Sequence, residues 1–245
     1  MIPKYMIIGL ILVAVIVIGI DIYIATRQTS TQETITPTTT TETTTSAQAE
    51  STTTEIEAIR YMAEEEKLAY DVYTKLAEMY PDVPVFANIA KSESTHVNAV
   101  LSLAEKYGID IKLGPAGKFN NTHIQELYNH LVEMGSKSLE DALKVGATIE
   151  EVDIVDLRDW ISKVNKPDII QVFECLMMGS RNHLRAFTST LQNIYGTTYT
   201  PQYLSQEEYE QIINSPMETG NTVCLSIGIN VSPDMGATQS SAAKK

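Results

Sequence analysis

Apolar residues recur every three or four positions over most of residues 55–220, and no stretch shows the two-residue alternation of a half-buried strand. Helix-capping residues divide this region: Thr54 and Glu57 form a capping box at the first start, and Gly196 follows the last long segment. The segments predicted to be helical are 55–80, 84–108, 122–135, 138–164, 167–196 and 205–215. Four of them are long and joined by short or medium links, which predicts an all-α fold, a four-helix bundle with short extra helices.

The inward stripe of each long helix is apolar at both ends and polar in the middle. The polar positions share one level of the predicted bundle: Glu66, Glu93, His96, Glu150, Asp153, Ser180 and His183. Unpaired buried carboxylates are costly, so acidic residues in the middle of three apolar faces are hard to sustain without a compensating positive charge. A bound metal would supply that charge.

The acidic and imidazole side chains of this level are the predicted metal ligands: Glu66, Glu93, His96, Glu150, Asp153 and His183. Glu93 and His96 lie one turn apart on the same face, and a mixture of oxygen and imidazole ligands suits iron or manganese and tolerates zinc. A coarse repeat supports the site, because Glu66 lies 30 residues before His96 and Glu150 lies 33 before His183. Without metal, His183 is instead a core histidine bonded to Glu150.

Four stretches resemble the ferritin-like superfamily in its rubrerythrin-like branch: EEEKLAYDVY at 64–73, SESTH at 92–96, GATIEEVDI at 146–154 and GSRNHLRAF at 179–187. Within it, the chain looks closest to an uncharacterised ferritin-like domain family of prokaryotes. The resemblance implies a ferritin-like bundle in which Glu66 is a ligand and Tyr73 its companion seven residues on. It maps one E-x-x-H motif onto Glu93 and His96.

The resemblance also maps a third glutamate ligand onto Glu150 and a second E-x-x-H motif onto the fourth helix. That motif is incomplete, because His183 is present but Ser180 replaces the glutamate. Asp153, one turn from Glu150, can replace the missing carboxylate by geometry; otherwise the site holds one metal, or two weakly. Tyr73 is then a catalytic candidate, as a redox or hydrogen-bonding partner of the metal, or simply a core tyrosine.

Resemblance to this superfamily implies a di-metal carboxylate site that holds two iron ions, with a single ion as the alternative. It also implies redox chemistry in which ferrous iron is oxidised or peroxide is reduced. The chain has no CxxC pair, so it lacks the electron donor that rubrerythrins carry and an enzyme would need an external one. The alternative is a non-enzymatic, surface-displayed helical module that binds or supports other molecules and holds one metal or none. The sequence is compatible with a homodimer.

Segments outside the bundle differ sharply in composition. Residues 1–27 include an almost wholly aliphatic run, and Tyr5–Thr26 would span about 33 Å as a helix, enough for a single-pass membrane anchor. The flanking charges favour a bundle on the extracytoplasmic side of the cell membrane. Residues 28–54 form a Thr/Ser-rich linker predicted to be disordered, residues 55–220 the bundle domain, and residues 221–245 a disordered tail.

Charge and cysteine content exclude several other functions. The chain carries 18 Lys and Arg against 31 Asp and Glu, a net charge of −13, and lacks the basic cluster that nucleic-acid binding requires. Its two cysteines are too few for a Cys-rich zinc module. Cys175 is predicted to be a buried small hydrophobe, with a disulfide to Cys224 as the alternative. Glu151 lies off the inward stripe and is expected to face water, although it is the alternative third-helix ligand.

Overall fold

The computed structural model describes residues 43–219 and residue 224 of the chain. Over these residues the structure is all-helical, with six helices and no strand. The helices are α2 (Thr43–Met79), α3 (Val85–Lys106), α4 (Thr122–Gly135), α5 (Leu139–Lys163), α6 (Pro167–Tyr195) and α7 (Gln206–Asn214). Five of the six begin and end within two residues of the predicted positions.

Local chemistry explains these ends. The side chain of Ser138 accepts a hydrogen bond from the backbone N–H of Asp141, which caps α5, and Ser205 caps α7 through Glu208 in the same way. Pro167 opens α6, where its missing N–H costs no hydrogen bond. Gly196 ends that helix with a φ of 65°, a left-handed conformation that glycine adopts without steric cost.

The start of α2 differs from the prediction. The helix begins at Thr43, so Thr54 lies inside it rather than capping it, and the last part of the predicted linker is helical. Residues 47–50 read Ala-Gln-Ala-Glu, which are good helix formers. Extending an existing helix costs far less than starting one, so these residues continue the packed helix that follows them.

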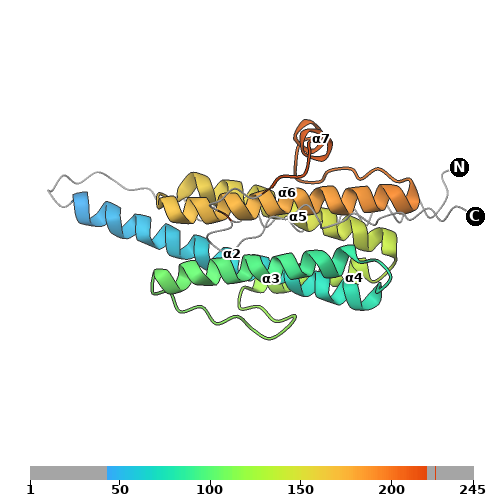
Figure 1. Ribbon diagram of the computed structural model, residues 1–245. Coiled ribbons are helices and arrows are strands. Elements are labelled where there is room, and N and C mark those ends of the chain that lie inside the picture. Colours follow the sequence, from blue (N-terminus) through green and yellow to red (C-terminus); the bar gives the residue numbers. More distant parts are fainter. Residues whose placement is uncertain (1–42, 220–223, 225–245) are drawn as a thin grey trace, which may run out of the picture. The chain divides into compact units, whose positions relative to one another are not determined.

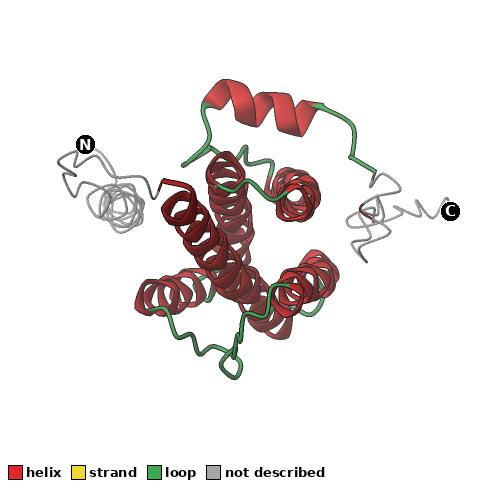
Figure 2. Cartoon of the chain, turned by 90° about the vertical axis from the view of Figure 1, so that its left-hand side faces the viewer, coloured by secondary structure: helices red, strands yellow, loops and turns green. Residues whose placement is uncertain are grey.

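The long helices α2, α3, α5 and α6 run in roughly the same direction (Figure 1), and the turned view looks nearly along most of them (Figure 2). Two apolar clusters fill this interior. One contains Val72, Phe86 and Phe187; the other contains Met62, Val100 and Phe173. The predicted polar level separates the two clusters along every long helix, which confirms the apolar–polar–apolar pattern of the stripes.

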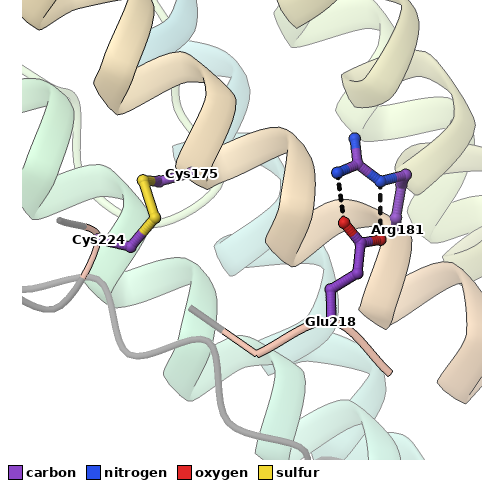
Figure 3. The surroundings of a disulfide bond; sticks show 4 residues. All are labelled: Cys175, Arg181, Glu218 and Cys224. Atoms are coloured by element: carbon purple, nitrogen blue, oxygen red, sulfur yellow. Dashed lines mark hydrogen bonds and ion pairs between the residues drawn. A yellow bond between two sulfur atoms is a disulfide. The ribbon is translucent and has the colours of Figure 1, made fainter. Parts of the chain in front are cut away.

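Helix α7 lies across the direction of the long helices, outside α6 (Figures 1 and 2). Its Tyr209 and Ile212 are buried. Beyond it, Cys224 forms a disulfide with Cys175 of α6 (Figure 3). The expectation that Cys175 is only a small hydrophobe is therefore wrong, because a residue 49 positions later folds back onto α6.

No helix in the described part of the chain is long and apolar enough to cross a membrane. The predicted anchor at residues 1–27 lies outside the described residues. So do linker residues 28–42 and, apart from Cys224, residues 220–245.

Candidate metal centre

Three helices supply the acidic groups of the polar level, and two of the four long helices supply its imidazoles. Glu66 comes from α2, Glu93 and His96 from α3, Glu150 and Asp153 from α5, and His183 from α6. All six side chains are buried. Since each lies midway along a regular helix, the backbone positions are fixed by the packing of the apolar clusters on either side.

Glu66, Glu93 and His96 make the first half of the centre. The Nδ1 atom of His96 lies 2.8 Å from Glu93 Oε2 and 3.2 Å from Glu66 Oε2. One ligand atom from each residue lies within 4.8 Å of the other two, close enough for one metal ion to bind all three.

Glu93, Glu150 and His183 make the second half in the same way. The Nδ1 atom of His183 lies 2.6 Å from Glu93 Oε1 and 3.3 Å from Glu150 Oε2. Despite these short distances, Nδ1 has no hydrogen bond of acceptable geometry, as expected for groups oriented toward a common point rather than toward one another. The two oxygens of Glu93 thus belong to different halves, and this carboxylate joins them.

The two imidazole rings are stacked, with centroids 5.4 Å apart, and neighbouring residues fix both. His183 Nε2 lies 3.1 Å from the hydroxyl oxygen of Ser92. The other edge of His96 faces the α6 backbone, where a Cβ atom on Gly179 would lie 2.7 Å from its Nε2 and Cε1. Sequence analysis missed both supporting residues. In the sequence, Ser92 and Gly179 are marked only by being small residues close to predicted ligands or to the helix face opposite them.

Some oxygens of the centre lack partners. Glu66 Oε1 and Asp153 Oδ1 are buried and have no hydrogen-bond donor among the described residues. Such atoms are expensive to remove from water without compensation. A metal ion would provide that compensation, and carboxylate oxygens with imidazole nitrogens are the donors that iron and manganese prefer. The residues therefore fit a metal.

Burial and charge strongly perturb the ionisation of these groups. Burial raises the pKa of Glu66 to about 7, although the charge of His96 opposes the shift. Burial alone would lower the pKa of His183, but the charges of Glu93 and Glu150 outweigh it and raise the pKa to about 9. Burial would likewise raise the pKa of Glu93, yet the two imidazolium charges hold it well below its usual range. Without metal, protons therefore supply the positive charge that the carboxylates need.

Asp153 lies beside the two halves rather than within them. The Ser180 hydroxyl is hydrogen-bonded to one of its oxygens, and its single proton is shared between that oxygen and the backbone oxygen of Leu176, 3.0 Å away. Burial and the charges of Glu66 and Glu150 raise the pKa of Asp153 well above its usual value. The structure thus pairs Asp153 with the serine that replaces the expected carboxylate, and leaves its second oxygen unbonded.

Tyr73 contacts the second half of the centre. Its hydroxyl donates to Glu150 Oε1 at 2.5 Å and lies 3.2 Å from the backbone oxygen of Gly146. Burial and the charge of Glu150 raise the pKa of this phenol well above its usual value. Tyr73 therefore remains a hydrogen-bond donor to a candidate ligand throughout the neutral pH range.

Two acidic residues beside the stripe have structural roles, and for Glu151 this corrects the expectation that it faces water. Glu151 is fully buried, and it accepts hydrogen bonds from the backbone of residues 202–204 and from the hydroxyl of Tyr199. Glu64 is buried and accepts from the backbone N–H groups of Asn120 and Asn121. Both anchor loops that fold back onto the helices, so Glu151 is not the third-helix ligand.

Comparison with known proteins gives a family match and an uncharacterized relative. A family model described as an uncharacterized protein domain (DUF2202) matches residues 55–216. The uncharacterized protein MJ0754 of Methanocaldococcus jannaschii is 54% identical over 168 residues, which cover 68% of this chain and 90% of the relative. The crystal structure of hypothetical protein MJ0754 from Methanococcus jannaschii matches with a TM-score of 0.64 and 48% identity, over 77% of this chain and 100% of that chain. None of these descriptions names an activity.

Proposed function

Since the chain belongs to the DUF2202 family of uncharacterized domains, we propose a function from its own centre: the domain binds a pair of metal ions in a ferritin-like helical bundle. Glu66 and His96 would hold one ion, and Glu150 and His183 the other. Glu93 would be shared between them.

The observation that supports this proposal is the position of Glu93. Its two oxygens face two different imidazoles, at 2.8 Å and 2.6 Å. Each imidazole has a further carboxylate within reach, from Glu66 and Glu150 respectively. The four carboxyl groups of the centre, counting Asp153, outnumber its two imidazoles, so protonating both rings cannot balance them, and without metal Glu66 and Asp153 take up protons as well. Inward carboxylates and histidines on facing helices are how di-metal bundles are built.

Iron is the metal we propose, with manganese or zinc as substitutes, and the proposed activity is oxidation of ferrous iron, with peroxide as the electron acceptor, or reduction of peroxide. Bound iron would supply one-electron chemistry. In our proposal Tyr73 keeps Glu150 oriented and holds a proton beside it, while Asp153 takes the place of the carboxylate missing at Ser180. Electrons for peroxide reduction would come from an external donor. We further propose that residues 1–27 anchor the chain in the cell membrane, with the bundle extracytoplasmic.

Metal content tests the proposal most directly. We would purify the full chain, reconstitute it with ferrous iron under anaerobic conditions, and measure metal per chain by plasma mass spectrometry. The native chain should bind about two ions, Glu93→Gln should lose most of both, and Glu174→Gln, an exposed position on α6, should behave as native. One ion or fewer per native chain with iron, manganese and zinc alike would disprove the dinuclear centre.

A second candidate function is a non-enzymatic surface module. The observation that favours it is Ser180, whose hydroxyl already bonds Asp153 where a di-metal bundle of this kind would place another ligand. Such a module would hold one metal or none, with the imidazole–carboxylate contacts acting as a charged network. One tightly bound ion that resists oxidation by air and by peroxide would favour this function over the oxidoreductase.

A further inference from the structure

A pocket of about 330 Å³ opens between α5, α6 and α7, apart from the metal centre. Its basic lining consists of Arg158 from α5 with Arg181 and Arg185 from α6. The whole chain has only five arginines, so three of them meet at one place in an acidic protein. Apolar side chains of Ile154, Met177 and Ile212 complete the wall.

One carboxylate of the chain already binds two of these arginines. Glu218 receives hydrogen bonds from Arg181 Nε at 2.8 Å and from its Nη2 at 2.5 Å (Figure 3). Arg185 Nη2 adds a third at 2.9 Å. This two-pronged contact is the geometry in which a guanidinium recognises a carboxylate.

The pocket retains unused binding capacity with Glu218 in place. The Nη1 atom of Arg181 has no hydrogen-bond partner among the described residues. Within the described part of the chain, Arg158 uses only Nη1, which bonds Glu208, a residue that also lines the pocket. Arg185 has no spare nitrogen, because its Nε and Nη1 already bond Ile212 O and Asn182 Oδ1, and its Nη2 bonds Ser215 Oγ besides Glu218. The unused donors therefore belong to Arg158 and Arg181, and a cavity of this size exceeds what one ion pair needs.

Glu218 is held in place from two directions. Its backbone N–H donates to Asn182 Oδ1. Six residues after Glu218, Cys224 forms the disulfide with Cys175, and Cys175 lies six residues before Arg181 on α6 (Figure 3). A short covalent tether keeps the local concentration of a linked group high. The disulfide therefore favours the intramolecular contact of Glu218 over any competing ligand.

We propose that this pocket is a binding site for a small organic carboxylate, and that Glu218 is its tethered internal competitor. The ligand's carboxylate would replace that of Glu218 on Arg181 and Arg185, and its body would lie against Ile154, Met177 and Ile212. Opening the disulfide would weaken the competitor and so strengthen binding.

Isothermal titration of the full chain with succinate tests the site, and it needs no metal, so its outcome is independent of the proposed dinuclear centre. Glu218→Gln should bind succinate at least tenfold more tightly than the native chain, and Glu218→Gln with Arg181→Gln should lose that gain. Glu174→Gln, an exposed change on the same helix, should match native. Inorganic phosphate should bind Glu218→Gln at least tenfold more weakly than succinate.

Cys224→Ser provides a second variant that leaves every lining residue intact, in case Glu218→Gln does not fold. It should bind succinate several-fold more tightly than the native chain, as should the native chain after reduction. Unchanged affinity in the folded variants would overturn the proposal and leave a structural clamp. Equal binding of phosphate would overturn the assignment to carboxylates.

Discussion

Glu150 and Glu151 are neighbours on α5 and both are buried, yet their surroundings are opposite. Glu151 receives hydrogen bonds from three backbone N–H groups, at 2.8 Å from Gln202, 3.4 Å from Tyr203 and 3.3 Å from Leu204. The hydroxyl of Tyr199 adds a fourth donor at 2.9 Å. Glu150 has one neutral donor, Tyr73, and otherwise faces an imidazole and other carboxylates.

This difference separates two uses of a buried carboxylate. A carboxylate surrounded by donors recovers in hydrogen bonds what it loses in hydration, and it fixes the loop that provides them. A carboxylate among other carboxylates recovers nothing unless a proton or a metal ion is also bound. Glu151 therefore belongs to the fold, while Glu150, Glu66 and Glu93 make sense as ligands.

Matched glutamine substitutions in the metal-free chain give the largest expected contrast. Glu151→Gln places an amide NH₂ group against donors, and we expect it to lower the free energy of unfolding by about 2 to 3 kcal/mol. Glu66→Gln removes the cost of burying a carboxylate charge, which outweighs the attraction of His96, and we expect a change within about 1 kcal/mol of zero or a gain in stability. Urea unfolding followed by circular dichroism measures both. Equal losses would show that the two carboxylates have the same role.

The pH dependence of the metal-free chain should show the same contrast. His183 has a pKa of about 9 in the fold, above its unfolded value, so its stabilising contribution is complete below about pH 6.5 and disappears as the pH rises through 9. The raised pKa of Glu66, about 7, acts with the same sign.

We therefore expect the free energy of unfolding of the metal-free chain to fall by on the order of 2 kcal/mol between pH 6 and 9.5. Binding of manganese should remove most of this fall, because the metal replaces the protons. Urea midpoints at several pH values, with and without manganese, measure both curves. A metal-free stability that stays constant over this range would contradict the proposed protonation of the centre.

Sequence patterns predicted the helices and the polar level but not the anchoring carboxylates. Five helices and the grouping of Glu66, Glu93, His96, Glu150 and His183 follow from helix-capping residues and from the inward stripes. Glu151 could not be assigned from a stripe, because a helical pattern records which face points inward and not which loop covers another face. Its donors come from residues about 50 positions later, and the disulfide partner of Cys175 is equally remote.

Two glycines allow the ligand sphere and the core to be perturbed separately. A Cβ atom at Gly179 would lie 2.7 Å from the His96 ring, whereas one at Gly146 would lie 2.6 Å from the Phe187 ring. We expect Gly179→Ala to displace His96 and weaken manganese binding about tenfold. Gly146→Ala should instead cost about 1 to 3 kcal/mol of stability by overpacking and leave manganese affinity within about threefold of native. Manganese titration and urea unfolding measure the two effects. If Gly146→Ala weakened manganese binding and Gly179→Ala did not, His96 would not be a ligand.

Tyr73 makes the smallest and most specific prediction. Tyr73→Phe removes one hydrogen bond to Glu150 but keeps the ring packed on Phe187, whose centroid lies 5.0 Å away. Stability should fall by about 1 kcal/mol, and the number of bound ions should stay native, since Tyr73 is not a ligand. If Tyr73 orients Glu150 for reaction, the rate of ferrous-iron oxidation or peroxide reduction should drop while binding persists. An unchanged rate would make Tyr73 a core tyrosine, and loss of metal would mean that Glu150 depends on this hydrogen bond for binding itself.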